Sequence, residues 1–208
     1  MSAEEATTAT PRRSRRGRPR TPGAEDRLFS AALEEYGEHG WAGFTMDAVA
    51  RRAGVGKSTI YLRWRDKDTL LADAVVASRP NAEPADTGTL RGDLEMLTAN
   101  LFHFYLDAAG WATLRIVIDA AGSPEPLGRF AEAVTDLHRE AMEVVSEQAV
   151  TRGDAPADDE LDQLWSCVYG SLLIQVLDLR TRHRTLDDEQ IADRATALAD
   201  FVLASVTT

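Results

Sequence analysis

Cysteine, lysine and long apolar runs are scarce in this sequence of 208 residues, which contains one cysteine and two lysines. A single thiol, Cys167, excludes an intrachain disulfide and a zinc site built from several cysteines. No stretch reaches the roughly 18 uninterrupted apolar residues of a membrane span, and residues 1–20 lack the apolar run of a signal peptide. We therefore expect a soluble, cytoplasmic protein without a membrane partner, in which the thiol stays reduced.

The patterns of catalytic and metal sites are missing as well. The four histidines lie on different predicted elements without metal-ligand spacing, and no serine or cysteine constellation accompanies them. They are His39, His103, His138 and His183. We predict no metal site, no cofactor and no enzymatic activity.

Negative charge is abundant but unevenly distributed. Residues 1–70 hold 13 Lys or Arg and 10 Asp or Glu, a balance of +3, so the formal net charge of −11 leaves −14 for residues 71–208. This division favours a protein whose N-terminal part contacts nucleic acid. A purely architectural role is disfavoured, because the acidic remainder would repel the DNA that such a protein wraps.

Residues 1–22 are rich in Thr, Ala, Pro and Arg and show no periodic apolar pattern, so we expect a disordered basic arm. The segment Arg16-Gly17-Arg18-Pro19-Arg20 resembles the core of an AT-hook, whose arginines enter the narrow minor groove of A·T-rich DNA. We therefore interpret Arg16, Arg18 and Arg20 as DNA contacts. The alternative is a solubilising tail.

Apolar residues recur at helical spacing along the rest of the chain, and no strand pattern competes, which predicts an all-α fold of about nine helices. They are expected at residues 24–39, 45–54, 56–65, 67–76, 90–109, 111–121, 126–152, 158–179 and 185–205. Gly40 is expected to end the first helix and Gly110 to separate the fifth from the sixth. Gly54 is expected to adopt the left-handed conformation of a tight turn.

Two short helical patterns meet at this turn and resemble a helix-turn-helix. Thr45 can cap the second helix. In the third, Ile60 and Trp64 form a buried face, which turns Lys57, Ser58, Tyr61, Leu62 and Arg65 outward. No acidic residue occurs from position 56 through 65, and an absence of carboxylates is what a phosphate-facing surface requires. The pattern predicts a helix that lies in a DNA groove.

The N-terminal part is similar to the DNA-binding domain of the TetR family of transcriptional regulators over roughly residues 24–76. The resemblance rests on Ala31-Ala32-Leu33, Tyr36, Gly40-Trp41, Thr45-Met46, Val49-Ala50, Ala53-Gly54-Val55-Gly56-Lys57, Thr59-Ile60-Tyr61, Trp64, Lys67 and Leu70-Leu71. It implies an all-helical homodimer with a three-helix head, a connecting helix and a C-terminal bundle that binds a small molecule. By position, it assigns phosphate contacts to Thr45 and Lys67, backbone or base-edge contacts to Tyr61 and Arg63, and contacts nearest the bases to Lys57, Ser58 and Thr59.

Two residues depart from the family pattern. Gly56 stands where a serine cap is frequent, and Leu62 stands where a polar residue is common. We predict that Leu62 contacts a thymine methyl group instead of forming a hydrogen bond.

The chain divides into four predicted parts. Residues 78–89 contain two prolines and a glycine without helical spacing, so they separate the head from the body. The parts are the arm at 1–22, a helix-turn-helix DNA-binding domain at 23–67, a connecting helix at 67–78, and an effector-binding and dimerisation domain at 79–208.

In the body, polar residues set among aromatic ones predict a ligand pocket between helices. The candidates are Phe102, His103, Tyr105, Trp111, Arg115, Asp119, His138, Met142, Trp165 and Tyr169. The alternative is that they are ordinary core and surface positions of amphipathic helices. An acidic body favours a neutral or cationic lipophilic effector.

The helix from Leu161 has more apolar residues than one small bundle can bury, which predicts a dimer interface. Together with the last helix, which Thr185 and Asp188 are expected to start as a capping box, it would form a four-helix interface. Its candidate residues are Val168, Leu172, Gln175, Leu179, Leu198 and Phe201. A two-fold dimer would place its two DNA-reading helices about 34 Å apart, or a multiple of this, on a palindromic operator.

The predicted function is therefore a dimeric repressor of transcription that binds double-stranded DNA. A small-molecule effector would release it by shifting the connecting helix. The alternative is a DNA-binding regulator that is controlled by a protein partner or is constitutive.

Overall fold

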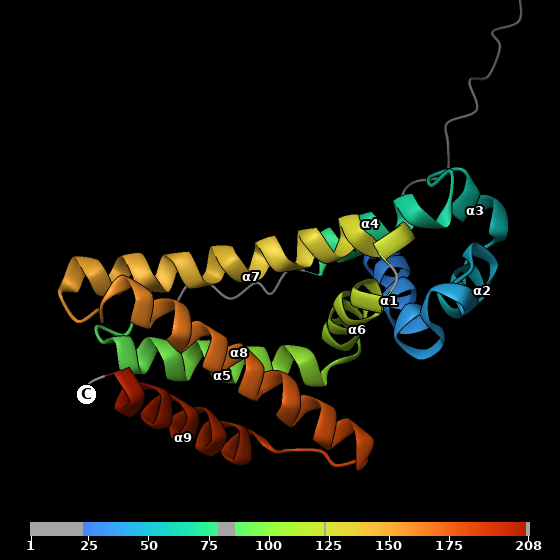
Figure 1. The fold of residues 1–208 in the computed structure, drawn as a ribbon. Coiled ribbons are helices and arrows are strands. Elements are labelled where there is room, and N and C mark those ends of the chain that lie inside the picture. The colour runs from blue at the N-terminus through green and yellow to red at the C-terminus, as the bar shows by residue number, and fades with distance from the viewer. Residues whose placement is uncertain (1–22, 79–85, 123, 207–208) are drawn as a thin grey trace, which may run out of the picture.

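The structure, a computed structural model, describes residues 23–78, 86–122 and 124–206. These ranges contain nine α-helices and no β-strand, so the predicted all-α class is confirmed (Figure 1). The basic arm predicted at residues 1–22, with Arg16, Arg18 and Arg20, lies outside the described residues.

The helices α1 to α4 lie at one end of the molecule, and α5, α7, α8 and α9 form an elongated body beside them (Figure 1). Between the two, α6 packs against both α1 and α7. The bounds are α1 Ala24–Gly43, α2 Met46–Arg52, α3 Lys57–Tyr61, α4 Lys67–Ala77, α5 Leu90–Leu106, α6 Ala108–Gly122, α7 Pro124–Arg152, α8 Asp158–Thr181 and α9 Asp188–Val206.

The predicted helix ends in the head are confirmed where glycine or threonine determines them. Helix α1 is interrupted at Gly40, whose φ of 62° and ψ of −173° are not helical. Thr45 caps α2, because its hydroxyl accepts a hydrogen bond of 3.2 Å from the N–H of Ala48. Gly54 has a φ of 67°, the left-handed conformation that glycine adopts without strain.

The third helix is shorter than predicted and consists of residues 57–61 only. Its predicted buried pair is confirmed, since Ile60 is 0% exposed and Trp64 is 4% exposed. Trp64 lies beyond the end of the helix, and its indole N–H donates to Asp73 of α4 at 2.8 Å. The buried ring therefore fixes the segment after α3 onto α4.

The predicted break at Gly110 between the fifth and sixth helices is wrong. The chain leaves the helical conformation at Asp107, whose carboxylate accepts a hydrogen bond of 3.2 Å from the N–H of Ala109. Gly110 lies inside α6, where an added Cβ would be 1.9 Å from the carbonyl oxygen of Phe104. Glycine is required here because two backbone segments approach closely, and not because a helix ends.

The predicted capping box of the last helix is also wrong. Asp187 accepts a hydrogen bond from the N–H of Gln190 at 2.8 Å, and the Gln190 side chain accepts one from the N–H of Asp187 at 3.2 Å. An aspartate and a glutamine thus form a capping box two residues later than the pair predicted at Thr185 and Asp188. Helix α9 consequently begins at Asp188 instead of residue 185.

One buried core crosses from the head into the body. Its buried side chains include Leu33 and Tyr36 of α1, Leu70 and Leu71 of α4, Ile116 of α6 and Phe130 of α7. Two further cores fill the space between the body helices. The sequence boundary near residue 79 thus separates elements that share buried apolar surface, and the domain division stays a prediction. None of the described helices has the length and apolar character needed to cross a membrane.

Candidate functional site

The exposed side of α3 and the residue after it form a surface that we call the reading surface, made up of Lys57, Ser58, Thr59, Tyr61 and Leu62. All five side chains are exposed, and Tyr61 and Leu62 are 53% and 87% exposed. Ile60 is the one buried residue of α3. The helix therefore presents nearly its whole circumference outward, on a frame held by α2 and α4.

A carboxylate from α2 also lies on this surface. Asp47 Oδ2 is 2.5 Å from Lys57 Nζ, and Asp47 Oδ1 accepts a hydrogen bond of 3.5 Å from the Tyr61 hydroxyl. Sequence reasoning found no acidic residue from 56 to 65 and missed Asp47, because this residue belongs to the preceding helix. Its position in the first turn of α2 is the signal that could have found it.

Lys67 has a structural role that the sequence did not predict. Its Nζ donates hydrogen bonds to the carbonyl oxygens of Trp41 at 2.9 Å and Phe44 at 3.3 Å, and it lies 3.9 Å from the centroid of the Trp41 ring. Burial lowers the pKa of this ammonium group. The contacts fasten the start of α4 to the segment after the break in α1. The predicted phosphate contact of Lys67 stays a prediction.

Thr45 and Arg63, which were also predicted as backbone contacts, have partners within the chain. The Thr45 hydroxyl is engaged as the cap of α2. Arg63 forms an ion pair of 3.5 Å with Glu25 and lies 5.7 Å from the Trp64 ring. Both residues flank the reading surface.

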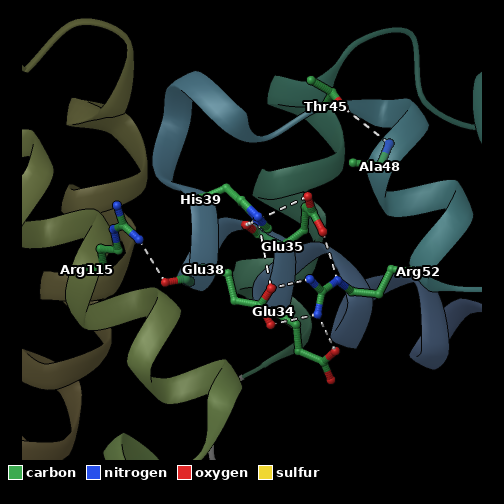
Figure 2. A network of polar contacts seen from close by, with 9 residues as sticks. Glu34, Glu35, Glu38, His39, Thr45, Ala48, Arg52 and Arg115 are labelled. Atoms are coloured by element: carbon green, nitrogen blue, oxygen red, sulfur yellow. Dashed lines mark hydrogen bonds and ion pairs between the residues drawn. The ribbon is translucent and has the colours of Figure 1, made fainter. Parts of the chain in front are cut away.

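A charged network holds α2 onto α1 (Figure 2). Arg52, the last residue of α2, contacts Glu35 at 2.8 Å, Glu38 at 2.5 Å and Glu34 at 3.4 Å. The hydrogen bond from Arg52 lowers the pKa of the Glu38 carboxyl, and the same bond raises the pKa of Arg52. Glu35 is 5% exposed, so its pairing with Arg52 offsets the cost of burying the carboxylate. The network orients the helix that carries Asp47.

Three of the predicted effector residues, Trp111, Arg115 and Asp119, lie against the head. The Gly37 carbonyl oxygen accepts hydrogen bonds from Trp111 Nε1 at 3.1 Å and Arg115 at 2.8 Å. Figure 2 shows Arg115 reaching across to α1. Asp119 accepts a hydrogen bond of 2.9 Å from the Tyr36 hydroxyl and pairs with Arg115 at 3.5 Å. We call this group the α1–α6 joint; it consists of Tyr36, Gly37, Trp111, Arg115 and Asp119.

The joint is tightly packed. A Cβ on Gly37 would lie 3.2 Å from the Trp111 ring. Burial and the Asp119 hydrogen bond raise the pKa of Tyr36, which keeps the phenol protonated as a donor. On the body side, the Arg180 guanidinium of α8 lies 4.4 Å from the Trp111 ring centroid. The joint therefore links α8, through α6, to the first helix of the head.

A second group of predicted effector residues does come together inside the body. The Tyr105 hydroxyl is hydrogen-bonded to His138 Nε2, and the rings of His138 and Tyr169 are 5.2 Å apart. We call Tyr105, His138 and Tyr169 the aromatic triad; they come from α5, α7 and α8. Met142 packs against the core cluster that contains Trp165, whose indole N–H donates to Ser146 at 3.0 Å. Burial lowers the pKa of His138 to about 4, so the imidazole is neutral near pH 7.

The remaining two effector candidates do not line this group. Phe102 is 0% exposed within a core cluster, whereas His103, the next residue, faces solvent. A groove of about 380 Å³ lies elsewhere, at the far end of the body between the start of α5 and the segment before α8. Its lining includes Leu90, Pro156 and Leu203 and none of the predicted effector residues.

Most of the predicted dimer residues are buried within the single chain, which corrects their assignment to an exposed face. Val168, Leu172, Leu179 and Leu198 are between 0% and 7% exposed. Gln175 accepts a hydrogen bond of 2.6 Å from Arg194 of α9. Of the six, Phe201 is largely exposed, at 69%, and Ile174 of α8, which the prediction omitted, is 65% exposed.

Comparison with known proteins identifies the fold and the family. Residues 28–74 match the family model of bacterial regulatory proteins, tetR family, and residues 84–198 match the tetracyclin repressor-like C-terminal domain. The second match alone covers more than half of the chain. The protein belongs to the TetR family. It is a helix-turn-helix transcriptional regulator, as its sequence predicted.

Other transcriptional regulators resemble the chain over most of its length. The uncharacterized HTH-type transcriptional regulator Rv1556 of Mycobacterium tuberculosis is 29% identical over 185 residues, which cover 88% of both chains. A TetR-like regulator from Rhodococcus sp. RHA1 has a TM-score of 0.68 at 18% identity, covering 90% of this chain and 99% of its own. FadR of Bacillus subtilis in complex with stearoyl-CoA has a TM-score of 0.65 at 13% identity, covering 88% and 97%. The structural likenesses show the fold.

Proposed function

We propose that this TetR family regulator is a repressor that binds a palindromic operator as a homodimer and releases it when a small molecule binds to the body. The observation that supports operator binding is the reading surface, which carries a cation, three hydroxyl groups and one apolar side chain. These groups are mounted on buried Ile60 and Trp64, so they would meet DNA in a fixed orientation.

The contacts are assigned by their chemistry. We place Lys57, Ser58 and Thr59 nearest the bases, Leu62 against a thymine methyl group, and Thr45, Tyr61, Arg63 and Lys67 at the backbone, with Arg16, Arg18 and Arg20 in the adjacent minor groove. An ammonium group has three N–H donors, so the two hydrogen bonds of Lys67 leave one for a phosphate.

We assign the dimer interface to α8 and α9. Ile174 and Phe201 supply large exposed apolar side chains on these two neighbouring helices, and burying them would stabilise a four-helix contact. A two-fold axis there would relate the two reading surfaces, which leads to a palindromic operator.

The aromatic triad is our candidate for the effector site. Burial lowers the pKa of His138 and raises those of Tyr105 and Tyr169, so all three groups are neutral near pH 7. They can hydrogen-bond to an uncharged polar group, while the surrounding apolar side chains favour a lipophilic body. That FadR binds stearoyl-CoA in the same fold is compatible with a long apolar ligand.

We further propose that the signal reaches the head by two routes. The sequence suggested the connecting helix α4, and Arg129 of α7 pairs with Asp68 of α4 at 3.2 Å. The α1–α6 joint offers a second route, because its hydrogen bonds tie α6 directly to α1. Helix α1 also carries the three glutamates that bind Arg52 of α2. An effector would change the head spacing only through different affinities for the two arrangements.

Selection of bound duplexes from a random pool tests operator recognition. We expect the full-length protein to enrich a palindrome whose half-sites are one or more helical turns apart. Lys57→Ala should relax preference at one base position per half-site, and Arg139→Ala, which removes an exposed cation from α7, should leave the enriched sequence unchanged. If the duplexes selected by the wild-type protein share no enriched sequence, operator recognition is refuted.

Titration of a panel of lipophilic molecules against the operator complex tests the effector site. An active compound should weaken operator binding, and Tyr105→Phe should reduce its potency more than His103→Gln, a change at the protein surface. An operator affinity that no compound alters would favour a protein partner or constitutive repression.

A further inference from the structure

Asp47 is a negative charge placed where a DNA-binding protein needs positive charge. It lies in the first turn of α2, is about half exposed, and contacts two residues of the reading surface that are one helical turn apart. Its two carboxylate oxygens have different partners, because Oδ2 contacts Lys57 Nζ and Oδ1 accepts from the Tyr61 hydroxyl.

We propose that Asp47 is a specificity-determining positioning residue, which holds Lys57 and Tyr61 in their DNA-contacting orientation and lowers affinity for DNA of unrelated sequence. This inference rests on the operator-binding function proposed above. Asp47 lies on α2 and would act through Lys57 and Tyr61 of α3.

Asp47 weakens binding to unrelated DNA by electrostatics. Affinity for any DNA sequence depends largely on cations that neutralise phosphates and release counterions. Asp47 balances the charge of Lys57, which is the one lysine of the reading surface. This neutralisation weakens binding to random sequence, because Lys57 then attracts an arbitrary phosphate less strongly.

Asp47 also restricts the orientation of the Lys57 side chain. A free lysine side chain has many rotamers, and ordering it on binding costs conformational entropy. The contact with Asp47 reduces this freedom, so Lys57 Nζ is already directed when a matching base edge arrives. A base contact in the operator therefore retains most of its strength, whereas attraction to a phosphate at an arbitrary position does not.

Asp47 itself is held in place by the contacts at both ends of its helix. Helix α2 starts at the Thr45 cap and ends at Arg52, whose guanidinium is bound by three glutamates of α1 (Figure 2). Both ends of the seven-residue helix are fixed, so the carboxylate has a defined position relative to α3.

Asp47→Asn tests the proposal in the full-length dimer. The duplex enriched by the wild-type protein and a scrambled duplex of equal length serve as probes. We expect affinity for the scrambled duplex to rise by about three- to tenfold and its salt slope to steepen by up to about 0.9, the contribution of one more phosphate contact. Affinity for the enriched duplex should change by less than about twofold, so the specificity ratio falls.

Asp136→Asn is the matched control. It removes the same charge from another exposed ion pair, at 3.1 Å to Arg139 on α7, outside the head. It should leave the specificity ratio and both salt slopes unchanged. If Asp136→Asn and Asp47→Asn changed the specificity ratio equally, the proposal would be overturned, because total charge alone would then explain the effect.

A double-mutant cycle distinguishes action through Lys57 from direct action on DNA. In a Lys57→Ala background, Asp47→Asn should have less than half of its effect on the scrambled duplex, because the charge that Asp47 balances is gone. A full effect in that background, or an unchanged ratio in Asp47→Asn alone, contradicts the proposal. Failure of the wild-type protein to enrich any duplex would instead refute operator recognition.

Discussion

The reading surface and the α1–α6 joint are both rich in polar side chains, but these side chains are held in different ways. On the reading surface they are exposed, and the contacts of Lys57 and Tyr61 with Asp47 are open to water. In the joint, Tyr36 is 0% exposed, and Trp111 and Arg115 both donate to the Gly37 carbonyl. Water can replace partners on the first surface, whereas in the second a lost partner leaves a buried or partly buried group unsatisfied.

This difference separates two kinds of mutational effect. Changes on the reading surface should alter DNA binding while the free energy of unfolding stays nearly constant. Changes in the joint or in the body beneath it should lower the free energy of unfolding. Four measurements test this separation, in order of decreasing effect on stability.

The largest loss of stability is expected for Gly110→Ala, at the start of α6. Its Cβ would collide with the carbonyl oxygen of Phe104, a backbone atom that cannot move alone. We expect the free energy of unfolding, measured with urea, to fall by about 3 kcal/mol. Gly128→Ala in α7, where an added Cβ meets no atom within 4 Å, should be neutral or stabilise by up to about 1 kcal/mol. Equal effects of the two changes would show that α5 and α6 can separate freely.

The free energy of unfolding is expected to fall at acid pH because of His138. Burial lowers the pKa of the folded state from 6.5 to about 4, so the unfolded chain binds a proton at a higher pH than the folded one. Its contribution is fully present above about pH 6.5 and is lost as the pH falls towards 4, at about 1.4 kcal/mol per pH unit. Between pH 6.5 and pH 5 the loss should be about 2 kcal/mol. His138→Gln should flatten this part of the profile, whereas His103→Gln, on the surface, should preserve it.

The matched pair Tyr36→Phe and Tyr61→Phe compares the two regions directly, since each change removes one hydroxyl group. Tyr36→Phe deprives Asp119 of a donor at 2.9 Å and should lower the free energy of unfolding by about 1–2 kcal/mol. Tyr61→Phe removes an exposed contact of 3.5 Å and should change it by less than about 0.5 kcal/mol. In DNA binding the order should reverse, with Tyr61→Phe weakening operator and random duplexes alike. A stability loss in both variants would break the distinction.

The smallest effect on stability is expected for Leu62→Ala. The side chain is 87% exposed, so the free energy of unfolding should change by less than about 0.5 kcal/mol. Operator affinity should fall by about 1 kcal/mol if Leu62 covers a thymine methyl group, and replacing that thymine with uracil should abolish the difference. A uracil substitution that has no effect would remove Leu62 from base recognition.

The head could be predicted from the sequence because its determinants are local. The Thr45 cap, the turn at Gly54 and the burial of Ile60 and Trp64 depend on residues within one or two helical turns. The contact of Asp47 with Lys57 was missed because it joins two helices, although the residues are only ten positions apart.

The body was harder to predict because its sites depend on distant packing. Trp111 was expected in a pocket, but it lies against Gly37, a residue 74 positions earlier, and nothing near it in sequence indicates that neighbour. Helix α8 is apolar on more than one side, so periodicity could not distinguish Val168, which is buried, from Ile174, which is exposed. Only the tertiary arrangement decides which apolar side is left for another subunit.

The core that joins Tyr36, Leu71 and Ile116 has a consequence for how the molecule comes apart. Because α1 packs against both α4 and α6 in this core, melting α6 would expose apolar surface of the head at the same time. We expect a single cooperative transition, with the same midpoint for a fluorescent probe in the head and for total helicity. A proteolytic cut between residues 79 and 85 should therefore leave the two pieces associated until denaturant separates them.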